Sequence, residues 1–516
     1  MRLRTDGAWP TKQLAAQVLI NCDYDSYGCS GGSPLTAYGY MQSTGIPDES
    51  CLPLTGTQEQ CNGLNRCRSC KEDGTCEAVT NYRKYYVSTY GRVTGETNMM
   101  REIYNRGTIS CRIDVNRDFT YYRRGVFASS GPSVYTHYVT IVGWGEEDED
   151  DYWIVRNSWG SYWGESGFAR IRRGFNIMGI ESDCSWAEPI LNGLNVTSVA
   201  AEKLSSAEKL ASPSELTSAS KLASPSELTS ASKLASPSKL STPTERSSTL
   251  GFSSCGYPTD WTLNTPVIKT PIPSSYVNVS SLPSTYDIRN LDGRNYATPQ
   301  RNEHSPLFCN ACWAQATTSA ISDRLNLQKK GAWPMVIVSS QVVLNCVGNG
   351  CGGGDTGDVY RYAYTDGLPD TTCQAYEGRQ KSCSDMGICM DCDRNGNCWG
   401  VANFRSVFVS EYGEVTGVDA MKAEIHERGP ITCFIVMTKE FMEYSGGVFV
   451  EHDHRYQGGH IVEVTGWGVT SLGQHYWIVR NNWGESWGES GWVRMNMGGS
   501  NLMIESACSW GVPYLV

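Results

Sequence analysis

Residues 475–498, HYWIVRNNWGESWGESGWVRMNMG, are nearly a second version of residues 151–174, DYWIVRNSWGSYWGESGFARIRRG. The likeness extends upstream, because the segment Gly-Ala-Trp-Pro at 7–10 recurs at 331–334. Between these points five cysteines per copy keep successive gaps of 10, 6, 3 and 6 residues: Cys51, Cys61, Cys67, Cys70 and Cys76, then Cys373, Cys383, Cys389, Cys392 and Cys398. Such self-similarity indicates one domain that occurs twice.

Length and composition agree with two domains. At roughly 100–200 residues per domain, 516 residues suggest two or three. Hydrophobic residues make up 40% of the chain, enough for buried cores, and 53 glycines favour turn-rich structure. No apolar run approaches the roughly 20 residues that span a bilayer. The net charge of −11 argues against a nucleic-acid partner, because that affinity depends on clustered Lys and Arg.

The 21 cysteines indicate a disulfide framework made in an oxidising compartment. We therefore expect the secretory pathway, a lysosome-like compartment or the extracellular space. The first residues contain no apolar core of signal-peptide type, so we expect a truncated start. Residues 282–330 have no counterpart in the first copy, which is accordingly predicted to lack its N-terminal part.

Four segments follow from these patterns. Residues 1–192 form the front-truncated copy and residues 282–516 the complete one. Residues 193–254 contain ASPSELTSASKL at 211–222 and again at 223–234, a Ser/Thr/Pro-rich repeat with too few large apolar groups to fold, so we predict a linker. Residues 255–281 form a short separate stretch between the predicted linker and the complete copy. Asn195 and Asn278 lie in Asn-x-Ser/Thr sequons and are candidate N-glycan sites.

In the second copy, residues 313–331 have apolar or small residues at helical spacing and end on Gly331, which predicts a helix. Residues 459–468 and 475–484 are β-branched and aromatic runs separated by a turn, which predicts adjacent antiparallel strands. The expected fold class is α+β.

The chemistry points to Cys312. Eleven cysteines occur from residue 309 onward, so at least one stays free or pairs elsewhere. A thiol at a helix N-terminus is favoured as the nucleophilic thiolate. Such a thiolate needs an imidazole and a group that orients it, and His460 and Asn481 on the two strands could supply them, with Trp483 as cover.

Three blocks carry a resemblance to a known family: FCNACWA around Cys312, GGHIVEVTGWG around His460 and YWIVRNNWG around Asn481. They resemble the active-site blocks of papain-family cysteine proteases, and LPSTYDIRNLDGRNYAT with NEHSPLFCNACW is most similar to the cathepsin X (cathepsin Z) branch. The resemblance implies a duplicated papain-like fold with a helical lobe and a β-rich lobe, peptide or protein substrates, and no cofactor or metal.

The resemblance also implies a disulfide scheme that leaves Cys312 free in the second copy and strands Cys29 in the first. The implied pairs are Cys309–Cys351, Cys346–Cys383, Cys373–Cys389, Cys392–Cys398, Cys433–Cys508, Cys22–Cys61, Cys51–Cys67, Cys70–Cys76 and Cys111–Cys184.

It further implies a role for each site residue. Cys312 is the nucleophile, His460 the proton carrier and Asn481 its orienting group, with Trp313 and Trp483 in support. His304, in a loop ahead of the nucleophile, would bind a substrate's terminal carboxylate and make the protein a carboxypeptidase. Cys255, in the pro-segment-like stretch 255–281, would cap Cys312 until activation.

Two departures bear on activity. Glu303 stands where the family has the glutamine that donates to the oxyanion, and Asn310-Ala311 replaces Gly-Ser. A charged Glu303 would repel the oxyanion, and losing one such donor costs on the order of 10²–10³ in rate. We therefore expect weak activity confined to acidic pH.

Other interpretations remain open. Cys309 and Cys312 could form a disulfide or half a metal site, and Cys389, Cys392 and Cys398 could bind zinc. His460 could be a structural histidine and His304 an ordinary loop residue. His137 and Asn157 match His460 and Asn481, yet no nucleophilic cysteine precedes them, so the first copy is a remnant or a binding module. The whole chain could be a non-catalytic tandem protein that binds peptides or partners.

Overall fold

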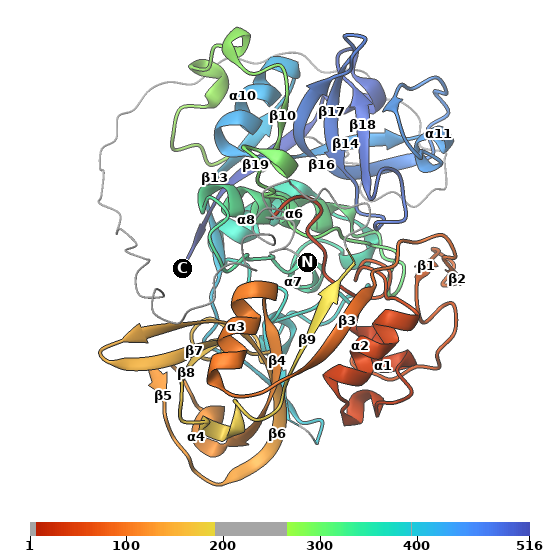
Figure 1. The fold of residues 1–516 in the computed structure, drawn as a ribbon. Coiled ribbons are helices and arrows are strands. Elements are labelled where there is room, and N and C mark those ends of the chain that lie inside the picture. The colour runs from red at the N-terminus through yellow and green to blue at the C-terminus, as the bar shows by residue number, and fades with distance from the viewer. Residues whose placement is uncertain (1–6, 191–265, 394) are drawn as a thin grey trace.

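The computed structural model describes residues 7–190, 266–393 and 395–516. In Figure 1 the first copy, red to yellow, occupies the lower part of the molecule, and the second copy, green to blue, occupies the upper part. The predicted linker 193–254, Asn195 and Cys255 lie outside the described residues. The duplicated α+β, papain-like architecture expected from the sequence is confirmed.

The second copy contains six helices among its described residues: α6 (Cys312–Gln328), α7 (Ser340–Cys346), α8 (Thr356–Thr365), α9 (Asp385–Ile388), α10 (Val418–Arg428) and α11 (Lys439–Met442). Its strands are β10 (Tyr286–Asp287), β11 (Met390–Cys392), β12 (Cys398–Gly400), β13 (Val407–Val415), β14 (Ile431–Met437), β15 (Val448–Phe449), β16 (Gly458–Val469), β17 (His475–Arg480), β18 (Trp492–Asn496) and β19 (Cys508–Leu515). Helices α6 to α9 build one lobe, and the sheet β13-β19-β14-β16-β17-β18-β15 builds the other.

Helix α6 joins the two lobes. Its residues from Cys312 to Asn326 are all buried, and the helix packs on α7 and α8 as well as on β16 and β19. Arg324 is fully buried, and its guanidinium donates to Glu424 and to the carbonyls of Gly429 and Gly511. Because each of these acceptors belongs to the β-rich lobe, one side chain ties the helix to the sheet.

The predicted elements around the site are confirmed, with shifted ends. The helix expected over 313–331 is α6, which begins one residue earlier and ends three residues earlier, at Gln328. The two expected strands are β16 and β17, which pair antiparallel with a bulge between Val464 and Gly466. Strand β16 also pairs with β14, where His460 lies opposite Ile435.

The first copy repeats this plan without a counterpart of α6 in residues 7–190. Its helices are α1 (Ala16–Cys22), α2 (Pro34–Ser43), α3 (Glu96–Arg106) and α4 (Arg117–Thr120). Its strands are β1 (Arg68–Cys70), β2 (Cys76–Ala78), β3 (Val87–Val93), β4 (Ile109–Asn116), β5 (Val126–Phe127), β6 (Ser133–Glu147), β7 (Asp150–Arg156), β8 (Phe168–Arg172) and β9 (Cys184–Pro189).

The missing helix has a visible structural effect. Helix α8 buries four residues, partly against α6, whereas its equivalent α2 buries none. The apolar core is also divided: one cluster covers the whole second copy, but the first copy has a small helical cluster and a separate sheet cluster.

All nine disulfides implied by the family resemblance are present. Cys29 is an exposed free cysteine, as expected for a copy that lacks the partner's segment. The three cysteines considered for zinc are engaged in the bonds Cys373–Cys389 and Cys392–Cys398.

The described part of the pro-segment-like stretch lies along the edge of the second sheet. Val267 forms a bridge with Tyr412 of β13, and the amides of Lys269 and Thr270 donate to Glu411. Asn278 is exposed.

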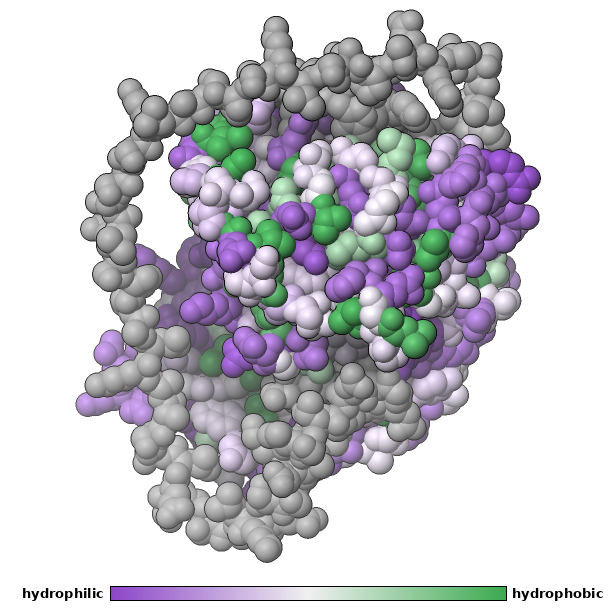
Figure 2. All heavy atoms as spheres, turned by 90° about the horizontal axis from the view of Figure 1, so that it is seen from above, coloured by the Kyte–Doolittle hydropathy of each residue, from purple (hydrophilic) through white to green (hydrophobic). Residues whose placement is uncertain are grey.

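None of the helices in the described ranges has the length and apolar character needed to cross a bilayer. On the face in Figure 2, hydrophobic side chains are scattered among polar ones and form no continuous patch.

Candidate active site

The three predicted catalytic residues come from three different elements. Cys312 is the first residue of α6, His460 lies on β16, and Asn481 directly follows β17. His460 Nε2 lies 2.8 Å from Asn481 Oδ1, and both side chains are buried. Since an amide oxygen only accepts, this bond fixes the proton on Nε2 and leaves Nδ1 able to receive one.

Neighbouring side chains hold this pair in place. The Trp483 ring lies against the His460 ring with centroids 4.8 Å apart. Arg480, next to Asn481, is buried and donates to Asp323 of α6 and to Glu463 of β16. The end of β17 is therefore fixed against both lobes. Burial lowers the pKa of His460 to about 4, although the bond to Asn481 raises it.

Cys312 departs from one expectation. It is disulfide-bonded and fully buried, so in this form it is not the free thiol that the family scheme implied. The alternative of a Cys309–Cys312 bond is also wrong, because Cys309 pairs with Cys351. The nine disulfides and the free Cys29 account for every other described cysteine.

Glu303 is buried beside Cys312 and is held by N–H donors. The indole of Trp483 donates to Oε1 at 2.8 Å, the amide of Ala311 donates to Oε2 at 2.9 Å, and the Cys312 amide also donates to this carboxyl. Burial nevertheless raises the pKa of Glu303 to about 8. The Cys312 amide, which would otherwise be free to donate to an oxyanion, is thus engaged by the chain's own carboxyl group.

His304 lies next to this carboxyl, with Nε2 3.8 Å from Glu303 Oε1. Its ring is stacked with Phe308 and Trp483, at centroid distances of 5.2 and 5.8 Å. Burial lowers the pKa of His304 to about 4. About a quarter of the side chain stays exposed, so an incoming group can reach it.

Two residues at the site were missed by sequence reasoning. The Asn302 side chain accepts from the His304 amide at 2.9 Å, and Tyr376 donates to the carbonyl of Glu303 at 3.1 Å. An Asn side chain often accepts from the backbone N–H two residues later and so forms an Asx turn. This turn signal could have identified Asn302. Tyr376 is distant in sequence and gives no such signal.

Trp313 explains why a glycine stands at position 354, in the glycine-rich segment 348–355. A Cβ at Gly354 would lie 2.6 Å from the Trp313 ring, so only glycine lets the backbone approach. Trp313 is fully buried and donates to the carbonyl of Asn310.

The first copy keeps part of the same arrangement. His137 Nε2 lies 2.9 Å from Asn157 Oδ1, and Trp159 stacks on His137 at 4.9 Å. None of the α-helices in residues 7–190 begins at a cysteine, as α6 does in the second copy. His137 instead borders a pocket of about 880 Å³, whose lining also includes Asp391 and Trp399 of the second copy.

Comparisons with known proteins show the family to which the chain belongs. A family model described as papain family cysteine protease matches residues 5–188 and 282–512. Cathepsin Z of Onchocerca volvulus is 43% identical over 245 residues, which cover 46% of this chain and 79% of that protein. The gut-specific cysteine proteinase of Caenorhabditis elegans is 30% identical over 252 residues, covering 45% and 74%. The solved structure of procathepsin B S9 from Trypanosoma congolense, 25% identical, covers 49% of this chain and 84% of its own, with a TM-score of 0.41. Since the two matched spans together make up more than half of its length, this chain belongs to the papain family of cysteine proteases.

Proposed function

We propose that the second copy is a cysteine-type carboxypeptidase in which Cys312, His460 and Asn481 carry the reaction. The observation that supports this most is the buried His460–Asn481 pair, covered by Trp483 and fixed between the helix that starts at Cys312 and the sheet.

The reaction uses only groups of this chain. The Cys312 thiolate attacks the scissile carbonyl, forming a C–S bond while the carbonyl π electrons move to oxygen. His460 Nδ1, which has taken the proton of the Cys312 thiol, then donates it to the leaving amine, and the C–N bond breaks as the carbonyl re-forms, giving a thioester. Water, deprotonated by His460, attacks the thioester and releases the shortened peptide acid and the thiolate. Asn481 keeps the imidazole oriented throughout.

Activation must first release the Cys312 sulfur. Cys255 is the only cysteine of the sequence outside the described ranges, and by count it is the proposed partner of Cys312. A small thiol reductant that attacks the Cys255 sulfur would free the Cys312 thiolate by exchange. Cutting the chain near residue 281 would not by itself break this bond.

We propose that His304 binds the substrate's terminal carboxylate. Its low pKa means that the ring is neutral in the empty site. A carboxylate placed against the ring would favour the protonated form, because an opposite charge at contact distance raises the pKa of an imidazole.

The experiment combines a probe and a pair of substrates. After treatment with a mild thiol reductant, a thiol-directed epoxide should label Cys312, and Cys312→Ala should abolish labelling. A peptide with a free C-terminus should be cut and its C-terminal amide should not. His304→Ala should lower kcat/KM for the free acid at least about tenfold, since a charge-assisted bond contributes roughly 1.5–3 kcal/mol.

The rival function is a non-catalytic tandem protein that binds peptides. Glu303 favours it, because this carboxyl group engages the Cys312 amide that an oxyanion needs. Labelling of Cys312 without turnover of either peptide at any pH would support the rival function and reject the carboxypeptidase.

A further inference from the structure

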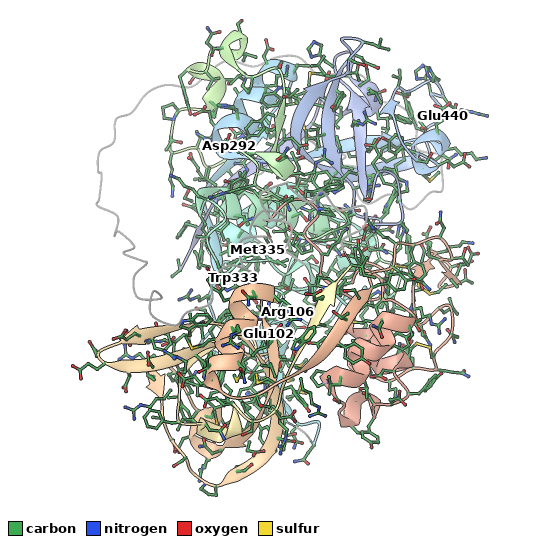
Figure 3. All side chains as sticks on the ribbon, viewed as in Figure 1. Glu102, Arg106, Asp292, Trp333, Met335 and Glu440 are labelled. Carbon is green, nitrogen blue, oxygen red and sulfur yellow. A yellow bond between two sulfur atoms is a disulfide. The ribbon has the colours of Figure 1, made fainter. Side chains whose placement is uncertain are left out.

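The two copies touch through contacts that occur in equivalent pairs. Trp9 of the first copy meets Trp492 of the second edge-on, with ring centroids 6.3 Å apart and an interplanar angle of 85°. Trp333 of the second copy meets Phe168 of the first at 5.9 Å and 88°. Trp9 and Trp333 occupy the same position of the repeat, as do Phe168 and Trp492. Figure 3 labels Trp333, which lies at the border between the copies.

A second pair of contacts has the same reciprocity. The Glu485 amide donates to Ser50 Oγ at 3.0 Å, and the Ser161 amide donates to Thr372 Oγ1 at 2.9 Å. Glu485 and Ser161 each follow the Trp-Gly of their copy, and Ser50 and Thr372 each precede the matching cysteine. Contacts that run equally in both directions define a pseudo-two-fold interface, the type that joins the subunits of a symmetric dimer.

Charge breaks this symmetry in one place. Lys12 forms a buried ion pair with Glu485, and Tyr85 donates to Glu485 Oε1 at 2.8 Å. The side chains of Lys12 and Glu485 are only 4% and 7% exposed. The residues equivalent to Lys12 and Tyr85 in the second copy are Val336 and Val407.

This asymmetry selects the partner. If two second copies met through the same surface, Glu485 would face two valines, and a buried carboxylate without a partner is strongly destabilising. The first copy supplies the cation and the hydroxyl that Glu485 needs. The surface around Glu485 therefore fits the first copy better than another second copy.

The same contact holds the loop that carries His304. The Cys70 amide donates to the His304 carbonyl at 2.9 Å, Ser305 Oγ donates to the Cys51 carbonyl at 3.0 Å, and the Asn302 amide group donates to the Ser50 carbonyl at 2.8 Å. Ser305 is 1% exposed. On the other side of the contact, disulfides Cys51–Cys67 and Cys70–Cys76 stiffen the first copy.

We propose that the first copy is a built-in subunit of the second: it docks through this pseudo-two-fold interface and holds the His304 loop in place. In this arrangement the copy without a nucleophile contributes to the site of the other. That the clamped loop then selects substrates with a free carboxylate rests on the proposed carboxypeptidase function.

Docking is tested on the full chain with a site-specific protease sequence inserted in the predicted linker 193–254. After cutting, the two halves should co-elute from a size-exclusion column. Glu485→Lys and, from the opposite side, Lys12→Met should weaken their association on the order of 100-fold, in the range found when one member of a buried charge pair is lost. Asp183→Lys, at the exposed Arg92–Asp183 pair of the first copy, is the matched control and should change nothing. Halves that separate in the parent protein, or that stay together with both variants, overturn the docking.

The clamp is tested by amide hydrogen exchange of residues 302–308 in the uncut chain. Exchange should become at least about tenfold faster in Glu485→Lys, since the three bonds to the first copy are lost, and should stay unchanged in Asp183→Lys. Equal exchange in parent and Glu485→Lys rejects the clamp. This readout needs no turnover, so it separates failure of the clamp from failure of the proposed function. In an active protein, the ratio of kcat/KM for free acid over amide should also fall in Glu485→Lys.

Discussion

Glu303 determines how the site behaves with pH. Its carboxyl group accepts from the Cys312 amide, and burial raises its pKa to about 8. A neutral carboxyl can donate one hydrogen bond to an oxyanion, whereas a charged one repels it. The sequence alone suggested activity confined to acidic pH, but the raised pKa extends the range of the neutral form to near neutrality.

Glu303→Gln should therefore change the pH profile of kcat/KM. In the parent the rate should fall as pH rises through about 8, and in the variant this fall should be absent. At pH 9.5, where only roughly 3% of Glu303 is still neutral, the variant should be faster at least about tenfold, because one oxyanion donor is worth on the order of 10²–10³. Glu489→Gln, at a carboxylate paired with Arg494, serves as control. Parallel profiles for parent and Glu303→Gln would count against this role.

Glu303→Gln should also change the pH dependence of protein stability, which can be measured without enzyme activity. Because the pKa of Glu303 is raised from 4.5 to about 8, the folded chain binds more protons than the unfolded chain between these values, and the parent loses stability as pH rises from 4.5 to 8. Thermal unfolding of the disulfide-bonded protein should show that the free energy of unfolding of Glu303→Gln increases relative to that of the parent as pH rises across this window. The difference should reach a few kcal/mol, at about 1.4 kcal/mol per pKa unit, and level off above the window. In Glu489→Gln the difference from the parent should stay constant across this window: burial raises the pKa of Glu489, but bonds from Arg494 outweigh it and lower the pKa below 4.5, so this group titrates below the window. A difference in the free energy of unfolding between the parent and Glu303→Gln that does not change with pH would refute the raised pKa of Glu303.

At the scale of elements, α6 links the lobes through Arg324. Arg324→Met should destabilise the second copy by about 3–5 kcal/mol, because Glu424 and two carbonyls lose a buried partner. The measurement is urea unfolding followed by a signal from the second copy, since a two-domain chain need not unfold in one step. Arg455→Ala, which removes an exposed side chain paired with Asp453, should leave the unfolding midpoint unchanged. Similar midpoints for Arg324→Met and the parent would show that the helix is held by apolar packing alone.

Elements near the site could be predicted from sequence because local signals marked them. The apolar spacing after Cys312 gave α6, and two β-branched runs around a turn gave β16 and β17. The cysteine spacings, read through the family, gave all nine described disulfides. The protonation of Glu303 could not be predicted, because it depends on burial and on donors 180 residues away in sequence, such as Trp483. The pairing scheme of the mature fold left Cys312 free, whereas the pro-segment-like stretch predicted a cap on its sulfur; the predicted capping residue, Cys255, lies outside the described residues.

At the scale of the whole molecule, the duplication could be predicted from the sequence, but the contact between the two copies could not. The sequence suggested only a long polar connection that imposes no fixed geometry. The structure instead brings equivalent residues together in reciprocal pairs, and these involve side chains such as Ser50 and Trp333 that carry no functional signal by themselves.

The ion pair between Lys12 and Glu485 has a consequence for how this gene product can change over time. Each residue sits in a different half of one polypeptide, and each is nearly sealed from solvent by the other half. A mutation that removes either charge penalises the pair, so the two positions are expected to be inherited or replaced together. The two repeats are therefore not interchangeable at this contact, since the second copy has Val336 where the first has Lys12.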